Sequence, residues 1–89
     1  SSDAAGAVRE GALLMPNPAD EGTVLYLREP PPAGTLLVVS DVRGGAVLRR
    51  PVSGAWTDVA TAGWPPGVYF VRLEQSGRSV WAGKLVVVR

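Results

Sequence analysis

Proline and glycine interrupt this chain so often that a long helix does not fit between them. The sequence has 89 residues, of which 11 are glycine and 8 are proline. Between these breaks, valine, leucine and aromatic residues form runs of about four to eight, without the period of a helix. Such runs, bounded by turn residues, are typical of short strands in a sandwich or a barrel. The sequence therefore predicts an all-β protein.

We place seven strands at residues 11–15, 23–28, 35–40, 46–50, 56–59, 68–74 and 78–88. Pro16 and Pro18 end the first strand, because proline lacks the N–H that a strand needs for pairing. Residues 30–34 hold three prolines and suit a stiff crossing from one sheet to the other. The Gly44-Gly45 pair suits a hairpin turn that needs positive φ. Together these features predict an all-β, Ig-like antiparallel β-sandwich of about seven short strands.

The last hairpin admits two registers. A two-residue loop would pair Leu73 with Val80, whereas a three-residue loop over residues 75–77 pairs Glu74 with Arg78, a favourable ion pair across the strands. We favour the three-residue loop. One face of the hairpin then carries Tyr69, Val71, Leu73, Trp81, Leu85 and Val87, with Lys84 on the other side. The opposite face carries Val68, Phe70, Val80, Ala82, Val86 and Val88.

That opposite face is also apolar, although a two-layer sandwich usually leaves its outer faces polar. Two explanations stand side by side. Either residues near a sheet edge are simply apolar here, or the face docks on a partner.

Composition excludes several kinds of function. Nine basic and eight acidic residues leave a net charge of +1, too small to indicate nucleic acid as the partner. The chain has no cysteine and no histidine, so it can form neither a disulfide, nor a Ser–His catalytic triad, nor a zinc site of the usual kind. No apolar run approaches the roughly 18 residues that span a bilayer as a helix. We expect no catalysis, no metal, no cofactor and no transmembrane segment.

Four strings of residues carry more specific information. In chain order they are LLMPNPA at 13–19, VVSDVRGGAV at 38–47, GVYFVRL at 67–73 and KLVVVR at 84–89. In this order they resemble the type A C-terminal sorting domain of the type IX (Por) secretion system of Gram-negative bacteria. The resemblance covers about residues 12–89. Two departures are Ser40, where the family often has an aromatic residue, and a second glycine at Gly44-Gly45.

The resemblance implies a set of recognition residues. They are Pro16, Asn17, Pro18, Asp41, Gly44, Gly45, Gly67, Tyr69, Lys84, Leu85, Val86, Val87, Val88 and Arg89. Structural roles fit several of them as well. Residues 16–18 suit a turn, Asp41 would bond loop amides, and Tyr69 would be a core aromatic residue with a tethered hydroxyl.

Residues 84–89 are the segment that we most expect to carry recognition. If they form an edge strand, their backbone could add to a receptor sheet, and recognition of the overall shape of the fold would serve equally well.

The resemblance also implies a route. Residues 12–89 would be a non-catalytic sorting domain, and residues 1–11 a linker from a preceding passenger domain such as a hydrolase or an adhesin. The outer-membrane translocon or shuttle of the type IX system would export the passenger through the periplasm to the cell surface or the medium. A sortase-like peptidase would cut the linker, in the region of Ala4, Ala5, Gly6 and Ala7. Small residues favour an accessible segment there.

Two other functions remain open from the sequence. The chain could be a carbohydrate-binding or Ig-like accessory module, with Trp56, Trp64 and Trp81 as a stacking platform for sugars. It could also be a spacer module, in which case further chain would follow Arg89.

Overall fold

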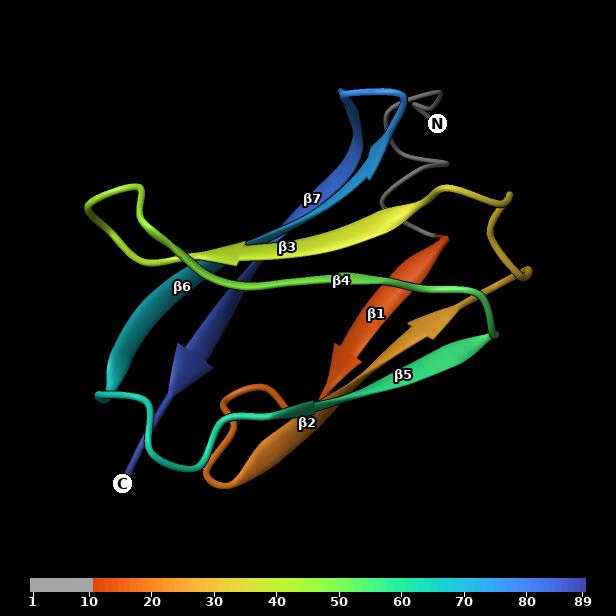
Figure 1. Cartoon of the computed structure of the whole chain (residues 1–89). Helices are drawn as coiled ribbons and strands as arrows, with labels where there is room; N and C mark the ends of the chain where they lie inside the picture. Colours follow the sequence, from red (N-terminus) through yellow and green to blue (C-terminus); the bar gives the residue numbers. More distant parts are fainter. Residues whose placement is uncertain (1–10) are drawn as a thin grey trace, which may run out of the picture.

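The computed structural model describes residues 11–89, and every regular element in this part of the chain is a strand. The strands are β1 (Ala12–Met15), β2 (Gly22–Leu27), β3 (Leu36–Ser40), β4 (Ala46–Pro51), β5 (Trp56–Ala60), β6 (Gly67–Gln75) and β7 (Arg78–Val87) (Figure 1). Each predicted strand end lies within one residue of the observed end. The pattern of apolar runs and turn residues was therefore enough to locate all seven strands.

The strands form two antiparallel sheets that make the two layers of a sandwich (Figure 1). One sheet has the order β1-β2-β5 and the other the order β4-β3-β6-β7. The proline-rich connection between β2 and β3 carries the chain from the first sheet to the second, as predicted. This arrangement confirms the β-sandwich.

The core lies between the two sheets and takes alternate residues from each strand. Leu25 of the first sheet and Leu37, Val39 and Leu85 of the second have no exposed surface. Burying a leucine or valine side chain contributes about 1.5–3 kcal/mol each. The inward residues therefore hold the sheets together, and the outward residues are free for other roles.

The turn of the last hairpin differs from the prediction. Ser76 and Gly77 alone form the loop, with φ of 52° and 77°, and Gln75 lies opposite Arg78. A two-residue turn with positive φ at both positions matches the right-handed twist of the flanking strands. The predicted pair of Glu74 with Arg78 is therefore wrong.

The face of the hairpin is nevertheless as predicted, because β7 contains a β-bulge. Glu74 lies opposite Ser79 and Leu73 opposite Trp81, which leaves Val80 as an extra residue. With a two-residue turn and no bulge, the apolar residues of β7 would face away from the core. The extra residue in the bulge shifts the register by one and turns them inward. The inward-facing residues of the hairpin are Tyr69, Val71, Leu73, Trp81, Leu85 and Val87, all buried. Val80 was predicted on the outer face, and this prediction is wrong, because its side chain packs against the core.

Gly83 makes room for a buried indole ring. A Cβ atom at this position would lie 2.6 Å from Cη2 and 2.9 Å from Cζ2 of Trp81. Because Trp81 is only 8% exposed, its ring has little space into which to move. The glycine is thus required by close packing on the inner face of β7.

Candidate recognition site

The first and the fourth of the sequence strings meet at Asn17. The peptide bonds before Pro16 and before Pro18 are both cis. Between these prolines, the side-chain Nδ2 of Asn17 donates to the carbonyl of Lys84 at 2.8 Å. Its Oδ1 accepts from the N–H of Val86 at 3.0 Å. The amide of Asn17 therefore pairs with β7 as a neighbouring strand would.

Ala19 continues this pairing with its main chain. Its N–H donates to the carbonyl of Val86, and its carbonyl accepts from the N–H of Val88, both at 2.8 Å. Ala19 is fully buried and forms a parallel bridge with Val87. We refer to residues 16–19 as the clasp segment, because they fasten the end of β1 to the outer edge of β7.

The clasp segment bears on how the last strand could be recognised. β7 is an edge strand, as one of the two sequence-based alternatives required. Its edge groups at Lys84, Val86 and Val88 are, however, already bonded to Asn17 and Ala19. Covering an edge in this way blocks pairing with another chain. A strand of another protein could add over residues 84–88 only by displacing the clasp segment.

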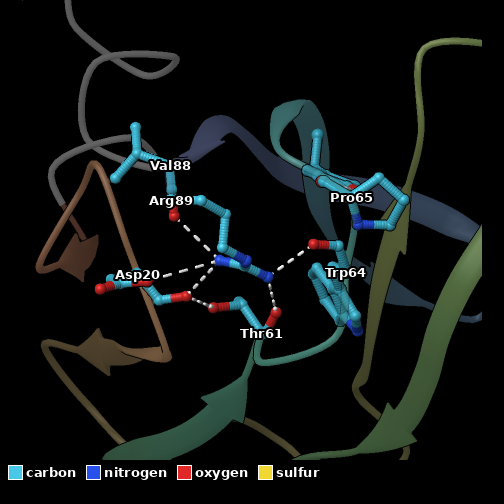
Figure 2. Close-up of polar contacts among 7 residues, drawn as sticks. Asp20, Thr61, Trp64, Pro65, Val88 and Arg89 are labelled. Atoms are coloured by element: carbon cyan, nitrogen blue, oxygen red, sulfur yellow. Dashed lines mark hydrogen bonds and ion pairs between the residues drawn. The ribbon is translucent and has the colours of Figure 1, made fainter.

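Arg89 fastens the other side of the same region (Figure 2). Its Nη1 donates to the carbonyls of Asp20 at 2.6 Å and Val88 at 2.9 Å, and its Nη2 to that of Thr61 at 2.9 Å and that of Trp64 at 2.5 Å. The carboxylate of Asp20 lies 3.6 Å from Nη1 but is 69% exposed, so this ion pair contributes little. The guanidinium thus acts mainly through carbonyl groups of two loops, which its planar set of donors suits.

The second string forms the turn between β3 and β4. Oδ1 of Asp41 accepts from the N–H of Arg43 at 2.9 Å and from that of Gly45 at 3.0 Å. Gly44 has the positive φ, 91°, that the glycine pair predicted for this hairpin. The expectation that Asp41 bonds loop amides is confirmed, and its carboxylate has a structural role.

The third string contains a tethered tyrosine. Tyr69 is 4% exposed, and its hydroxyl donates to the carbonyl of Pro65 at 2.5 Å. Its ring lies 5.1 Å from that of Trp64, tilted by 44°. A buried tyrosine that bonds back to the chain a few residues upstream is the tyrosine corner of Ig-like sandwiches. The predicted core position and tethered hydroxyl of Tyr69 are both confirmed.

The second and third strings face each other across an open hollow of about 530 Å³. Asp41 and Val42 lie on one side of it, and Gly67 and Tyr69 on the other. The structure therefore brings the predicted site residues together in two groups. Residues 16–18 lie with residues 84–89, and Asp41 lies with Gly67 and Tyr69.

Several partners at these groups were not expected from the sequence. Ala19, Asp20, Thr61 and Trp64 take part through main-chain atoms, as described above. A main-chain carbonyl is present in every residue, so no residue type marks these positions. The apolar Ala19 between Pro18 and Asp20 gave no sign that it bonds to β7.

The three tryptophans do not form one platform. Trp81 belongs to the buried core, as the predicted register required, and Trp64 is half-buried against Tyr69. Trp56 is 65% exposed on the outer side of β5 and lies opposite Tyr26, which is 43% exposed. A stacking surface can therefore include Trp56 but not the set predicted from the sequence.

A metal-binding cluster and a membrane-spanning helix are both absent among residues 11–89. Among residues 11–89, no group of three or more histidine, cysteine, aspartate or glutamate side chains could hold a metal ion. No helix in the described part of the chain is long and apolar enough to cross a membrane. The predicted cleavage region at Ala4, Ala5, Gly6 and Ala7 lies outside the described residues.

Comparison with known proteins finds this fold inside a much larger chain. The whole of this chain superposes with a TM-score of 0.73 and 21% identity on a part of PorZ, an essential bacterial surface component of the type-IX secretion system of the human oral-microbiomic Porphyromonas gingivalis. It spans 13% of the length of the PorZ chain. No family model matches the sequence, and no curated protein matches it. The likeness agrees with the sandwich fold that the apolar runs and turn residues predicted.

Proposed function

We propose that this chain is a C-terminal sorting domain of the type IX secretion system, a non-catalytic module that directs a larger parent protein across the outer membrane. The parent consists of a passenger domain, such as a hydrolase or an adhesin, joined to this domain through residues 1–11. It leaves through the translocon or shuttle of the system and is released or attached to the cell surface. A sortase-like peptidase cuts within residues 1–11.

The observation that carries this proposal is the contact between the first and fourth strings. Residues 16–18 and residues 84–89 belong to two of the four strings that in chain order resemble the sorting family, and they lie 67 and 69 positions apart where Asn17 bonds Lys84 and Val86. One side chain joins them. The likeness of the fold to a part of PorZ supports the same proposal.

A secretion reporter tests the proposal. All 89 residues are fused to the C-terminus of a folded fluorescent protein that carries an ordinary signal peptide. The fusion is expressed in a Gram-negative host with a type IX system, and in a matched strain that lacks the outer-membrane translocon. We expect fluorescence at the surface or in the medium of the first strain and in the periplasm of the second. The same location in both strains would reject a sorting role.

A carbohydrate-binding module is the second candidate, because one observation favours it. Leu13, Tyr26 and Trp56 lie opposite one another across the first sheet, and all three are exposed. Exposed aromatic rings present an apolar surface with a polar tip, which suits the faces of sugar rings. The predicted platform of three tryptophans is replaced here by Trp56 with Tyr26.

Affinity electrophoresis in gels with soluble polysaccharides tests this second candidate. Slower migration of the wild-type chain, relieved in Trp56→Ala, would support sugar binding. Equal migration with and without each polysaccharide would remove it.

A further inference from the structure

The outer face of the four-stranded sheet carries the residues of the third and fourth strings that the core does not use. Tyr69 and Val71 point inward from β6, whereas Phe70 points outward and is 49% exposed. In β7, Leu85 is buried, and Lys84 is exposed directly opposite Phe70. Core packing accounts for the inward-facing residues of both strings. It does not account for Phe70 or Lys84, because their side chains face away from the core.

Apolar side chains lie next to Phe70 toward the start of β6, while Lys84 and Ser40 lie directly opposite it on the two neighbouring strands. Val68 lies opposite Val86, both half-buried, and Val88 beyond them is 42% exposed. The predicted apolar face therefore exists, with Val80 as its one absent member. An apolar patch with a protruding aromatic centre is the arrangement of an interface hot spot.

Basic side chains border the same face. Arg49 and Arg72 lie opposite Val38 on the two neighbouring strands. Val38 faces outward but has no exposed surface. The aliphatic parts of the two arginine side chains can account for this burial. Glu74 bonds Arg72 at 2.6 Å. Neither Arg49 nor Lys84 forms an ion pair with any of the described residues. Among residues 11–89, these two cations therefore have no counter-charge.

We propose that this face, centred on Phe70 and bordered by Lys84, Arg49 and Arg72, binds an acidic protein surface of the export machinery. Phe70 enters an apolar pocket of that partner, and the basic residues meet carboxylates around the pocket. This inference rests on the proposed function and adds to it the surface and the chemistry of the partner.

Charge decides which partner fits. A second copy of the chain would bring the same cations against each other, which charged interfaces avoid. An anionic membrane surface is usually bound by clusters of about four to eight basic residues. This face has three, and Glu74 offsets one of them. An acidic protein surface with an apolar pocket can bind the ring of Phe70 in the pocket and pair its carboxylates with the few cations.

The secretion reporter described above tests the surface. Phe70→Ser and Lys84→Glu are compared with matched controls on other surfaces, Met15→Ser for the exposed apolar residue and Arg78→Glu for the exposed cation. We expect each face variant to lower the exported fraction about tenfold, as loss of a hot spot does. The controls should be exported like the wild type, and Lys84→Arg should restore export.

Thermal unfolding of each purified chain separates binding from folding. Lys84 is exposed and makes no side-chain bond among residues 11–89, so Lys84→Glu should melt like the wild type. If Phe70→Ser melts early, the comparison of Lys84→Glu with Lys84→Arg decides alone.

The possible outcomes separate the two proposals. Export of the wild type and of Lys84→Glu alike would overturn the docking face and leave the sorting role intact. Equal retention of face and control variants would also overturn it, since no one face would then matter. Binding of the wild-type chain to anionic lipid vesicles, lost in Lys84→Glu, would replace the protein partner with a membrane. Retention of the wild-type fusion would reject the sorting role, and the docking face with it.

Discussion

Replacing Arg89 should destabilise the fold through lost hydrogen bonds rather than lost charge. In Arg89→Ala the loop carbonyls of Asp20, Thr61 and Trp64 lose their shared donor. A hydrogen bond contributes about 1 kcal/mol net, and somewhat more when one partner is charged. Water can reach part of this site, since the Arg89 side chain is 36% exposed. We therefore expect a loss of about 2–3 kcal/mol in the free energy of unfolding.

Thermal unfolding by circular dichroism measures this loss. For a domain of this size, each kcal/mol lowers the melting temperature by about 4–8 °C, so Arg89→Ala should melt roughly 10–20 °C below the wild type. Arg89→Lys is the matched control, because it keeps the charge but cannot reach carbonyls of two loops with a planar fork. It should recover less than half of the loss.

Asp20→Asn separates the ion pair from the carbonyl bonds. Asparagine keeps the main-chain carbonyl that accepts from Arg89 and removes only the carboxylate at 3.6 Å. Because exposed ion pairs contribute about 0–1 kcal/mol, this variant should melt close to the wild type. Full stability in Arg89→Lys, or an effect of Asp20→Asn as large as that of Arg89→Ala, would refute the reasoning.

Three further substitutions test other contacts. Asn17→Ala removes the two side-chain bonds from Asn17 to β7 and leaves the main-chain bonds of Ala19 in place. It should lower the free energy of unfolding by about 1–2 kcal/mol in urea titration; an unchanged midpoint would contradict the role of this side chain. Tyr69→Phe should cost about 1 kcal/mol in the same titration, and no cost would mean that its hydroxyl is equally well placed in water. Gly83→Ala should lower the free energy of unfolding by about 2 kcal/mol, because the added methyl group would overlap the ring of Trp81. A melting temperature equal to that of the wild type would disprove this overlap.

Local signals in the sequence were sufficient for the strands and for most of the core. Alternating apolar residues in β6 and β7 identified which side chains face inward, including Trp81 and Leu85. The glycine in the β3–β4 turn and the tethered hydroxyl of Tyr69 also follow from residue type. These features depend on neighbours in the sequence, and so they can be read from it.

The register of the last hairpin could not be obtained in this way. The sequence suggested Glu74 opposite Arg78, whereas Gln75 takes that place. An ion pair across strands contributes at most about 1 kcal/mol, and burial of the β7 side chains contributes far more. Core packing and turn geometry together selected a β-bulge, which has no residue signature of its own at Val80.

What the sequence by itself determined is the set of strands, their buried faces and the resemblance of four strings to one family. Tertiary structure alone decided that Asn17 and Ala19 cover the edge of β7, and that Arg89 bonds the carbonyls of loops far away in the chain. The physical reason is that side-chain periodicity is encoded locally. Main-chain donors and acceptors are the same in nearly every residue, and only the folded chain shows which of them meet.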